Sequence, residues 1–187
     1  MRIIAGSAKG RRLKTLKGLD KRPTADRVKE TIFAVLGKKI QGAEALDLYA
    51  GTGNLGIEAL SRDAGAVLFV DNDAGAKKII EENLRVTLLQ DRAQIWRCDV
   101  FRALRRCRAS GRMFDVIFAD PPYGKGFGIQ TFLALGECGI LKQGGIFILE
   151  HQISEEVGAD SNQLKVFSEK LYGQTAVHFF QCFKTKE

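Results

Sequence analysis

The chain has 187 residues, of which 45% are hydrophobic and 27% charged, and its formal net charge is +7. These values predict one soluble globular domain with at most a small appendage. No apolar run approaches the roughly 18 residues that cross a membrane, and the first residues lack the long apolar core of a signal peptide. Four cysteines without C-x-x-C spacing and only two histidines argue against a zinc site or a disulfide framework, so we expect no metal and a reducing cytoplasm.

The positive charge is concentrated in residues 1–22, which hold eight lysines and arginines against one aspartate. The excess of +7 in this segment equals the net charge of the whole chain. Residues 2–14 indicate a small hairpin, because two short runs flank a turn that contains Gly6 and Gly10. So polarised a segment suggests a polyanionic partner, most simply nucleic acid. The alternative is a solvated basic arm.

A helix is predicted after the hairpin. Thr24 is its expected N-cap, and an apolar face extends to Ile40. Pro23 stiffens the chain just before the helix, so polar groups beside it can be aimed at a site. We therefore divide the chain into a basic hairpin and helix extension over residues 1–40 and a main domain over residues 41–187.

Residues 45–56 combine a short strand, a glycine-rich turn and the start of a helix. The G-x-G-x-x-G pattern of Gly51, Gly53 and Gly56 follows directly on the apolar strand. Glycine permits positive φ and lets a ligand approach the backbone closely. The exposed N–H groups at the start of a helix attract an anionic ligand group. This context favours a nucleotide-handling βα unit over a turn without a ligand.

Two ligands fit this unit, NAD and S-adenosylmethionine. About 20 residues beyond Gly51, Asp71 ends the next apolar run, where a carboxylate could bind ribose hydroxyls. Asp47 lies inside the first strand, where a buried carboxylate would repel a pyrophosphate. It could instead face the ammonium end of a methionine moiety, so Asp47 favours S-adenosylmethionine.

Strands and helices alternate along the main domain. Apolar strands are predicted at 45–49, 66–71, 94–98, 114–119 and 146–149, with helices from 55, at 74–89, at 100–109 and near 128–138. Continuous apolar strands between amphipathic helices predict a mostly parallel sheet covered on both faces. Right-handed crossovers then give a doubly wound α/β fold with ligands at the carboxyl ends of the strands. Residues 165–167 and 176–180 add a closing antiparallel pair, for seven strands in all.

Asp120-Pro121-Pro122-Tyr123 follows the predicted strand 114–119, at the carboxyl edge of the sheet beside the glycine loop. Both prolines lock φ and donate no N–H, so the segment is stiff and offers carbonyl acceptors next to a carboxylate. Such acceptors suit an amino group, and the Tyr123 ring offers a face on which a planar base could stack. These four residues are the catalytic candidates; the alternative is a proline-broken loop without such a role.

The Asp-Pro-Pro-Tyr segment and the loop from Asp47 to Gly56 together resemble the signature of class I S-adenosylmethionine-dependent amino-methyltransferases. Further stretches resemble the bacterial RsmD-type 16S rRNA guanine-N2 methyltransferases, namely residues 1–6, 22–30, 46–53 and 56–62. The resemblance covers roughly residues 1–150, and its N-terminal stretches make it specific. The sequence departs from the family pattern at Asp63, in a surface turn, and at Tyr49, where phenylalanine is usual.

The resemblance implies a Rossmann-like methyltransferase domain with S-adenosylmethionine as cofactor. The residues implied for the methionine part are Asp47, Ala50, Gly51, Thr52 and Gly53. Asp71 is implied for the ribose and Asp99 for the adenine amino group, and their neighbours Asn72 and Val100 are implied as further cofactor-binding residues. From the residues alone, Asp71 and Asp99 could instead cap the helices that follow them.

We therefore interpret the chain as a cytoplasmic enzyme that methylates guanine N2, with 16S rRNA or the assembling small ribosomal subunit as partner. The expected RNA contacts are Arg2, Arg11, Arg12, Arg22, Thr24 and Arg27. The alternatives are an amino-methyltransferase acting on DNA adenine or cytosine or on a protein amide, and a non-catalytic RNA-binding module with this fold. Arg102, Arg105 and Arg106 share a helical face that is either solvated or a second RNA contact. His151 is expected to be a satisfied surface or core residue.

Overall fold

The computed structural model describes residues 1–15, 23–158, 160–161 and 163–183. The strands are β1 (Glu44–Leu48), β2 (Ala66–Asp71), β3 (Ala93–Arg97), β4 (Phe114–Ala119), β5 (Leu141–Gln152), β6 (Leu164–Tyr172) and β7 (Thr175–Cys182). The helices are α1 (Pro23–Leu36), α2 (Asn54–Ser61), α3 (Ala74–Thr87), α4 (Val100–Ala109) and α5 (Phe127–Cys138). Two short 3-10 helices, η1 (Gly37–Ile40) and η2 (Gln90–Arg92), precede β1 and β3.

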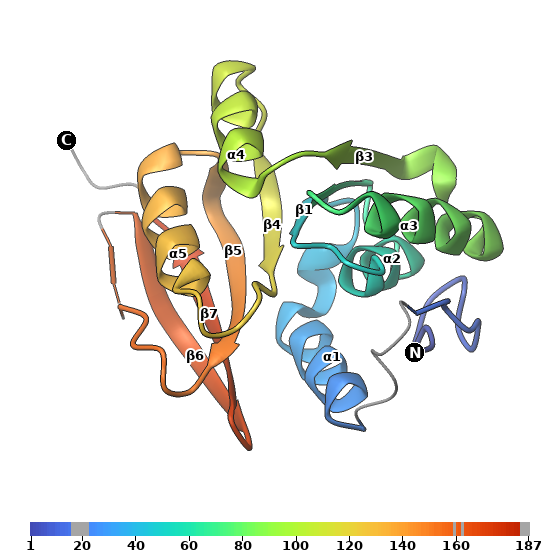
Figure 1. Cartoon of the computed structure of the whole chain (residues 1–187), viewed down its shortest axis with the longest axis horizontal. Coiled ribbons are helices and arrows are strands. Elements are labelled where there is room, and N and C mark those ends of the chain that lie inside the picture. Colours follow the sequence, from blue (N-terminus) through green and yellow to red (C-terminus); the bar gives the residue numbers. More distant parts are fainter. Residues whose placement is uncertain (16–22, 159, 162, 184–187) are drawn as a thin grey trace.

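All seven strands belong to one sheet, in the order β3-β2-β1-β4-β5-β7-β6 (Figure 1). The strands from β3 to β5 pair in parallel. β7 is antiparallel to both of its neighbours, β5 and β6. The predicted doubly wound sheet with a closing antiparallel pair is therefore confirmed.

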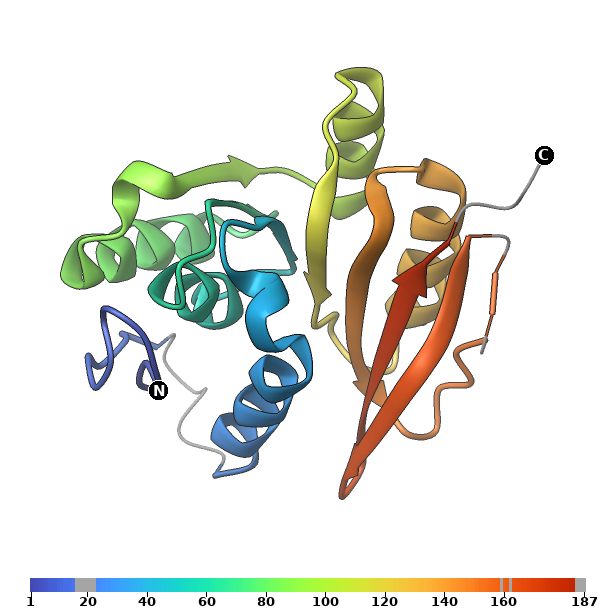
Figure 2. The same cartoon turned by 180° about the vertical axis from the view of Figure 1, so that it is seen from behind.

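Each face of the sheet carries its own apolar core, because successive strand residues point to opposite sides. On one face, Phe69 and Phe118 of the sheet belong to the core that includes Ile32 of α1 and residues of α2 and α3. On the other face, Phe147 belongs to the core that includes Leu104 of α4 and residues of α5. Figure 1 looks onto α4 and α5, and Figure 2 shows α1 on the opposite side. The helices thus cover both faces, as the continuous apolar strands require.

The first thirteen residues fold back on themselves as the predicted hairpin. Arg2 bridges Arg12 in antiparallel fashion, and the Ile3 N–H donates to the Arg11 carbonyl over 2.9 Å. Ile3 is buried in the same core as α1, α2 and α3. The hairpin is docked tightly on α2, because a Cβ at Gly6 would lie 1.6 Å from the Ser61 carbonyl oxygen.

A buried carboxylate on α2 fastens this hairpin to the rest of the molecule. The Glu58 side chain accepts hydrogen bonds from the backbone N–H groups of Ile4 and Ala5 over 2.8 and 3.0 Å. It also pairs with Lys29 at 3.2 Å and with Arg62 at 2.8 Å. Burial lowers the pKa of Lys29, against the opposite effect of the Glu58 charge. Breaking one side of a buried pair costs about 3–5 kcal/mol, so this contact firmly joins the basic extension to the main domain.

Several element boundaries differ from the sequence prediction, and three of the differences have a clear physical reason. α1 begins at Pro23, so Thr24 lies inside the helix and its prediction as N-cap is wrong; proline fits the first helical turn because its missing N–H is not needed there. α3 ends at Thr87, before Leu88 with its φ of 61°. β5 extends well beyond 146–149, because pairing with β7 carries its polar end through residue 152.

Candidate active site

The candidate site lies where the order of the strands reverses. β2 and β3 follow β1 toward one edge of the sheet, whereas β4 lies on the other side of β1. In doubly wound sheets, ligands bind in the crevice beyond the carboxyl ends of the strands at such a switch point. Leu48 of β1 is paired with Ala119 of β4, so the glycine loop and the Asp120 segment begin side by side.

The glycine loop is held to the end of the neighbouring strand β2. Gly51 and Gly53 have φ values of 53° and 76°, which glycine adopts without strain. The Gly51 N–H donates to Asp71 Oδ2 over 2.9 Å, and Asp71 Oδ1 accepts from the Asp73 N–H over 2.9 Å. Each carboxylate oxygen has two lone pairs, so Asp71 can shape the loop and still accept from ribose hydroxyls.

Asp47 is buried at the start of the same loop. Its Oδ2 accepts from the Gly56 N–H over 2.9 Å. A Cβ at Gly56 would lie 2.3 Å from the Phe69 ring and 2.9 Å from Asp47 Oδ2, so this turn of α2 requires glycine. Burial raises the pKa of Asp47 to about 8; the Gly56 hydrogen bond lowers it and the Asp71 charge raises it further. A cationic ligand group beside Asp47 would favour its ionised form.

The carboxylates after β2 and β3 have different local roles. Asp99 Oδ1 accepts from the Arg102 N–H over 3.0 Å, so Asp99 is the N-cap of α4, as one of the two readings of the sequence held. α3 is capped by Asp73, whose Oδ1 accepts from the Ala76 N–H, and not by Asp71. One capping bond leaves a carboxylate further lone pairs, so the capping role of Asp99 is compatible with a ligand contact.

The residues expected to hold an adenosine-containing cofactor therefore surround one edge of the sheet. Glycine N–H groups, the Asp71 oxygens and exposed Asp99 supply the donors and acceptors that such a ligand needs. Asn72 is exposed beside Asp71, and Val100 is buried beside Asp99. The donor set fits S-adenosylmethionine.

Tyr123 of the Asp-Pro-Pro-Tyr segment is held in place by contacts of its hydroxyl group with β5 and β7. Tyr123 is 36% exposed, and its hydroxyl donates to Glu150 Oε1 over 3.0 Å. The same hydroxyl lies 3.2 Å from Thr175 Oγ1. Pro121 is buried and Pro122 exposed, so the segment turns outward after its first proline. The Tyr123 ring is thereby held at the surface by β5 and β7.

Asp120 sits among carboxylates. The residue is exposed to solvent, yet surrounding protein atoms and the charges of Glu150 and Asp47 hold its pKa well above the usual range. Among the residues that the structure describes, no lysine or arginine forms an ion pair with Asp47 or Asp120. Such perturbed carboxyls at a strand edge are characteristic of functional sites. This group suits a ligand that brings N–H donors.

Asn83 links the N-terminal hairpin to the glycine loop. This fully buried side chain of α3 donates from Nδ2 to the Thr52 carbonyl over 2.9 Å and to the Lys14 carbonyl over 3.1 Å. Its Oδ1 accepts from the Lys14 N–H over 2.7 Å. The Lys29 ammonium group also reaches the loop, donating to Asn54 Oδ1 over 2.8 Å. The basic extension is therefore joined to the glycine loop through Asn83 and Lys29.

The expected RNA contacts differ in their surroundings. Arg2, Arg12 and Arg27 are exposed. Arg11 donates from Nη1 to the Val86 carbonyl at the end of α3. Arg22 lies outside the described residues, as does the side chain of Thr24.

Sequence reasoning assigned no role to four polar residues that contact the candidate site residues or the hairpin: Lys29, Asn83, Glu150 and Thr175. Asn83 and Lys29 had a signal, since each is a polar residue on the buried side of an amphipathic helix. Glu150 was recognisable as lying near the site, at the end of the predicted strand 146–149, whereas Thr175 had no signal. Their shared contact with Tyr123 was not predictable, because it depends on how β5 and β7 pair.

His151 follows Glu150 in β5 and points to the opposite face of the sheet. It is buried, with Nε2 at 2.7 Å from His178 Nδ1 and Nδ1 at 2.9 Å from the Gln152 carbonyl. Burial lowers its pKa. His151 is thus a core residue with its polar atoms satisfied.

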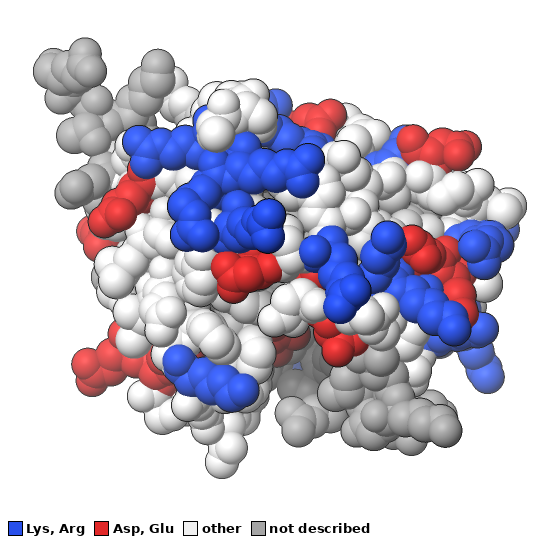
Figure 3. Space-filling model, turned by 45° about the horizontal axis from the view of Figure 1, so that its top comes forward, with Lys and Arg blue, Asp and Glu red and all other residues white. Residues whose placement is uncertain are grey.

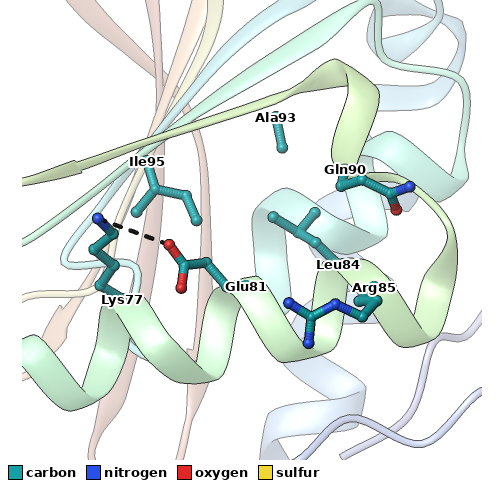
Figure 4. Close-up of a pocket in the computed structure, with 7 residues that line it drawn as sticks. All are labelled: Lys77, Glu81, Leu84, Arg85, Gln90, Ala93 and Ile95. Carbon is teal, nitrogen blue, oxygen red and sulfur yellow. Dashed lines mark ion pairs between the residues drawn. The ribbon is translucent and has the colours of Figure 1, made fainter.

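Two recesses lie outside the candidate site, one on each side of the edge strand β3. The first is lined by Lys77, Glu81, Leu84, Arg85, Gln90, Ala93 and Ile95 (Figure 4). The second is lined by Ile95, Trp96, Arg97, Cys98, Arg102 and Arg106. Neither contains the glycine loop or the Asp120 segment. Within the described residues, no group of three His, Cys, Asp or Glu could hold a metal ion, and no helix is long and apolar enough to cross a membrane.

Comparison with known proteins gives matches over almost the whole chain. The family model described as "Conserved hypothetical protein 95" matches residues 1–181. A Bacillus subtilis protein named "Putative rRNA methyltransferase YlbH" is 40% identical over 182 residues, covering 97% of this chain and 98% of that protein. "Ribosomal RNA small subunit methyltransferase D" of Escherichia coli (strain K12) is 31% identical over 181 residues, covering 97% and 89%.

Solved structures give the same result for the fold. An Escherichia coli protein described as "Putative methyltransferase yhhF" superposes with a TM-score of 0.85 at 27% identity, covering 99% of both chains. A Haemophilus influenzae protein described as "putative methylase HI0767" superposes with a TM-score of 0.80 at 30% identity, covering 98% of both chains.

Proposed function

Because this chain belongs to the family described as "Conserved hypothetical protein 95", we propose that it transfers a methyl group from S-adenosylmethionine to the N2 amine of a guanine in 16S rRNA. The RsmD-type resemblance of the sequence is confirmed by full-length relatives named ribosomal RNA small subunit methyltransferase D. One observation carries the proposal: the Asp120 segment begins beside the glycine loop at the switch point of the sheet. An amine held by the first would meet a cofactor held by the second.

The cofactor, when bound, would supply a methyl group on a sulfonium sulfur, which departs as a neutral thioether and is therefore a good leaving group. The chain's own residues hold and orient it. The glycine loop with Asp47 takes the methionine part, Asp71 and Asn72 take the ribose, and Asp99 with Val100 takes the adenine. The raised pKa of Asp47 supports this arrangement, because the ammonium group of the methionine part would stabilise the ionised carboxylate.

Asp120 and its neighbours prepare the amine for transfer. The lone pair of a guanine amine is delocalised into the ring, which makes it a poor nucleophile. Hydrogen bonds from its two N–H groups to the Asp120 carboxylate and the Pro121 carbonyl would turn the lone pair toward the methyl group. The amine must lose a proton once it is methylated. A carboxylate with a raised pKa, as at Asp120, is a suitable acceptor for that proton.

Tyr123 offers a surface for the base outside its stack. A target guanine in folded RNA must leave its neighbours to reach a site at the edge of a sheet, which costs a few kcal/mol. Stacking on an aromatic side chain recovers about 1–3 kcal/mol per base. Glu150 and Thr175 act as positioning residues, because they hold the hydroxyl and thereby fix the ring.

The basic hairpin would bring the RNA to this site. Arg2 and Arg12 are exposed on a segment that Asn83 and Glu58 fasten to the glycine loop and α2. RNA bound there would lie next to the cofactor. The partner is accordingly 16S rRNA, free or in an assembling small subunit, and the location the cytoplasm.

The test is methyl transfer from labelled S-adenosylmethionine to 16S rRNA that lacks the modification, followed by nucleoside mapping. We expect label on guanine N2, appearing about 10²–10³ times more slowly with the Asp120→Ala variant. Label on a DNA base or on a protein amide, with rRNA unmodified, would replace the proposed substrate by that alternative. Cofactor binding without transfer to any substrate would indicate a non-catalytic RNA-binding module.

A further inference from the structure

The helix α4 and the turn after it carry five arginines and no acidic residue between Val100 and Phe114. Its buried side consists of Val100, Ala103, Leu104 and Cys107. Its exposed side includes Arg102, Arg105 and Arg106, and Arg97 adds an exposed cation at the end of β3. Figure 3 shows basic side chains gathered over this part of the molecule. We call Arg97, Arg102, Arg105 and Arg106, together with Trp96, the α4 surface.

The arginines of the α4 surface have no acidic partners. Within the described part of the chain, no carboxylate forms an ion pair with any of them. The neighbouring helix α3 differs, since Lys77 pairs with Glu81 at 3.7 Å on its side of β3 (Figure 4). An array of cations without counterions is costly to hold together unless an anion compensates it.

Arg102 is also badly placed for the stability of its own helix. It is the third residue of α4 and lies in the first turn, three residues after the N-cap Asp99. The positive end of the helix dipole disfavours a cation there by about 0.3–1 kcal/mol. Helix stability therefore does not explain Arg102, whereas binding of an external anion does.

Trp96 gives the surface an aromatic component. The Arg106 guanidinium lies 4.0 Å from the centroid of the Trp96 ring. Both residues line the recess beside Arg97 and Arg102. A partly exposed aromatic ring walled by guanidinium groups matches nucleic acid, which combines phosphates with planar bases.

The location of the surface suits a long substrate. α4 begins directly after its N-cap Asp99, a candidate adenine residue, and its ten residues extend about 15 Å from there. The N-terminal hairpin packs on the opposite face of the sheet, with α2 and α3. RNA that contacts both would straddle the edge strand β3 and the rim of the site.

We propose that the α4 surface is a second RNA-binding surface, which contacts the phosphate backbone of the rRNA substrate on the side of the site opposite the N-terminal hairpin. This inference rests on the proposed function, since it assumes an RNA substrate at the Asp120 segment. It adds a contact that the catalytic motifs do not imply. It also explains why cations without acidic partners flank a site whose chemistry requires only carboxylates and glycines.

The test compares Arg102→Gln/Arg105→Gln with the matched control Lys38→Gln/Lys39→Gln, which removes two exposed cations from η1. Binding of a fluorescent 16S rRNA fragment is measured over a range of salt concentrations. We expect the arginine variant to bind the RNA more weakly. The slope of log binding constant against log salt concentration should be smaller in magnitude by up to about 1.4–1.8 if both arginines contact phosphates. The control should match the parent. Equal affinity and slope in both variants would overturn the inference.

Two further measurements separate the possible failures. Trp96 is the single tryptophan of the chain, so quenching of its emission by the RNA fragment reports contact at this surface directly, and unchanged emission contradicts it. The arginine variant could bind small-subunit particles more weakly than the parent while binding naked rRNA equally well. That result would identify an acidic protein as the partner and overturn the inference. If the parent protein transfers methyl groups and the arginine variant binds RNA as the parent does, only the role of the α4 surface is refuted. Absence of transfer by the parent would refute the proposed function, whatever the binding data show.

Discussion

The Tyr123 hydroxyl donates a hydrogen bond to Glu150 Oε1 over 3.0 Å, and this contact joins the loop after β4 to the strand β5. Burial and the nearby Glu150 and Asp120 charges raise the pKa of Tyr123, against the effect of Thr175. The phenol therefore stays protonated at physiological pH and can act as a donor but not as a base. Its chemical contribution is the position of its ring.

Two replacements of Tyr123 should distinguish the positioning role of its hydroxyl from the stacking role of its ring. Tyr123→Phe keeps the stacking face but loses the hydroxyl, so we expect nearly parental RNA affinity and a single-turnover rate lower by up to about tenfold, or ~1.4 kcal/mol. Tyr123→Ala also removes the stacking surface and should weaken productive RNA binding by about 1–3 kcal/mol. RNA titrations under single-turnover conditions check both. Identical behaviour of the alanine variant and the parent would exclude a stacking role.

Replacing Asp120 should reduce the rate of methyl transfer far more than it reduces RNA affinity. Asp120→Ala should leave the fold and most RNA affinity intact, because the residue is exposed, while removing a contact that strengthens in the transition state. Loss of one such preorganised contact commonly costs about 10²–10³ in rate. Asp120→Asn keeps one acceptor oxygen and should retain measurable activity if acceptance alone is needed. It should fall to the level of alanine if a charge or proton acceptor is required.

Single-turnover methylation with saturating cofactor and RNA distinguishes these outcomes. An Asp120→Ala variant with the parental rate would remove Asp120 from the mechanism. Equilibrium RNA binding serves as the control, since a parallel loss of affinity would indicate a binding role instead.

The stability of the protein without cofactor should fall as pH rises toward 8. Asp47 has a folded pKa of about 8, well above its usual range, so the folded state holds this proton more tightly than the unfolded state. The resulting stabilisation is fully present below about pH 4 and is lost progressively up to about pH 8. The raised pKa of Asp120 acts in the same direction. Urea unfolding at several pH values measures the effect, and Asp47→Asn should show a smaller decline.

The raised pKa of Asp47 should also couple cofactor binding to proton release. Ionisation of Asp47 beside a cationic group should release a proton below pH 8, so the binding enthalpy of S-adenosylmethionine should depend on the ionisation enthalpy of the buffer. NAD should not bind, because Asp47 and Asp120 crowd the place of its pyrophosphate. Tight NAD binding without a response to S-adenosylmethionine would reject the assignment of the site.

Asn83 should support both stability and cofactor affinity. Asn83→Ala leaves the Thr52 carbonyl and the Lys14 backbone without their partner, at a cost of roughly 1–3 kcal/mol for a buried polar group left unsatisfied. The loosened glycine loop should also bind the cofactor more weakly. Urea denaturation and calorimetry measure the two effects. Glu81→Ala on the exposed side of α3 is the matched control and should stay within about 0.5 kcal/mol.

Much of the fold could be predicted because local patterns reflect burial. Strands such as β2 are apolar without interruption, since both of their sides are covered, and helices such as α4 repeat apolar residues on one side only. The glycine turn after β1 was recognisable because only glycine tolerates its backbone angles and its close contact with Phe69. The polar ends of β5 were missed, because pairing with β4 at Leu141 and with β7 through Gln152, and not composition, decides where that strand begins and ends.

By itself, the sequence determined the α/β order, the glycine loop and the stiff Asp-Pro-Pro-Tyr segment, since each depends on neighbouring residues and the backbone angles they allow. Only the tertiary structure decided which distant polar groups meet. Asn83 reaches Thr52 across 31 residues of sequence, and Glu150 reaches Tyr123 across 27. Such contacts are set by the packing of α3 against the glycine loop and by the position of β5 beside β4, and no local preference encodes either.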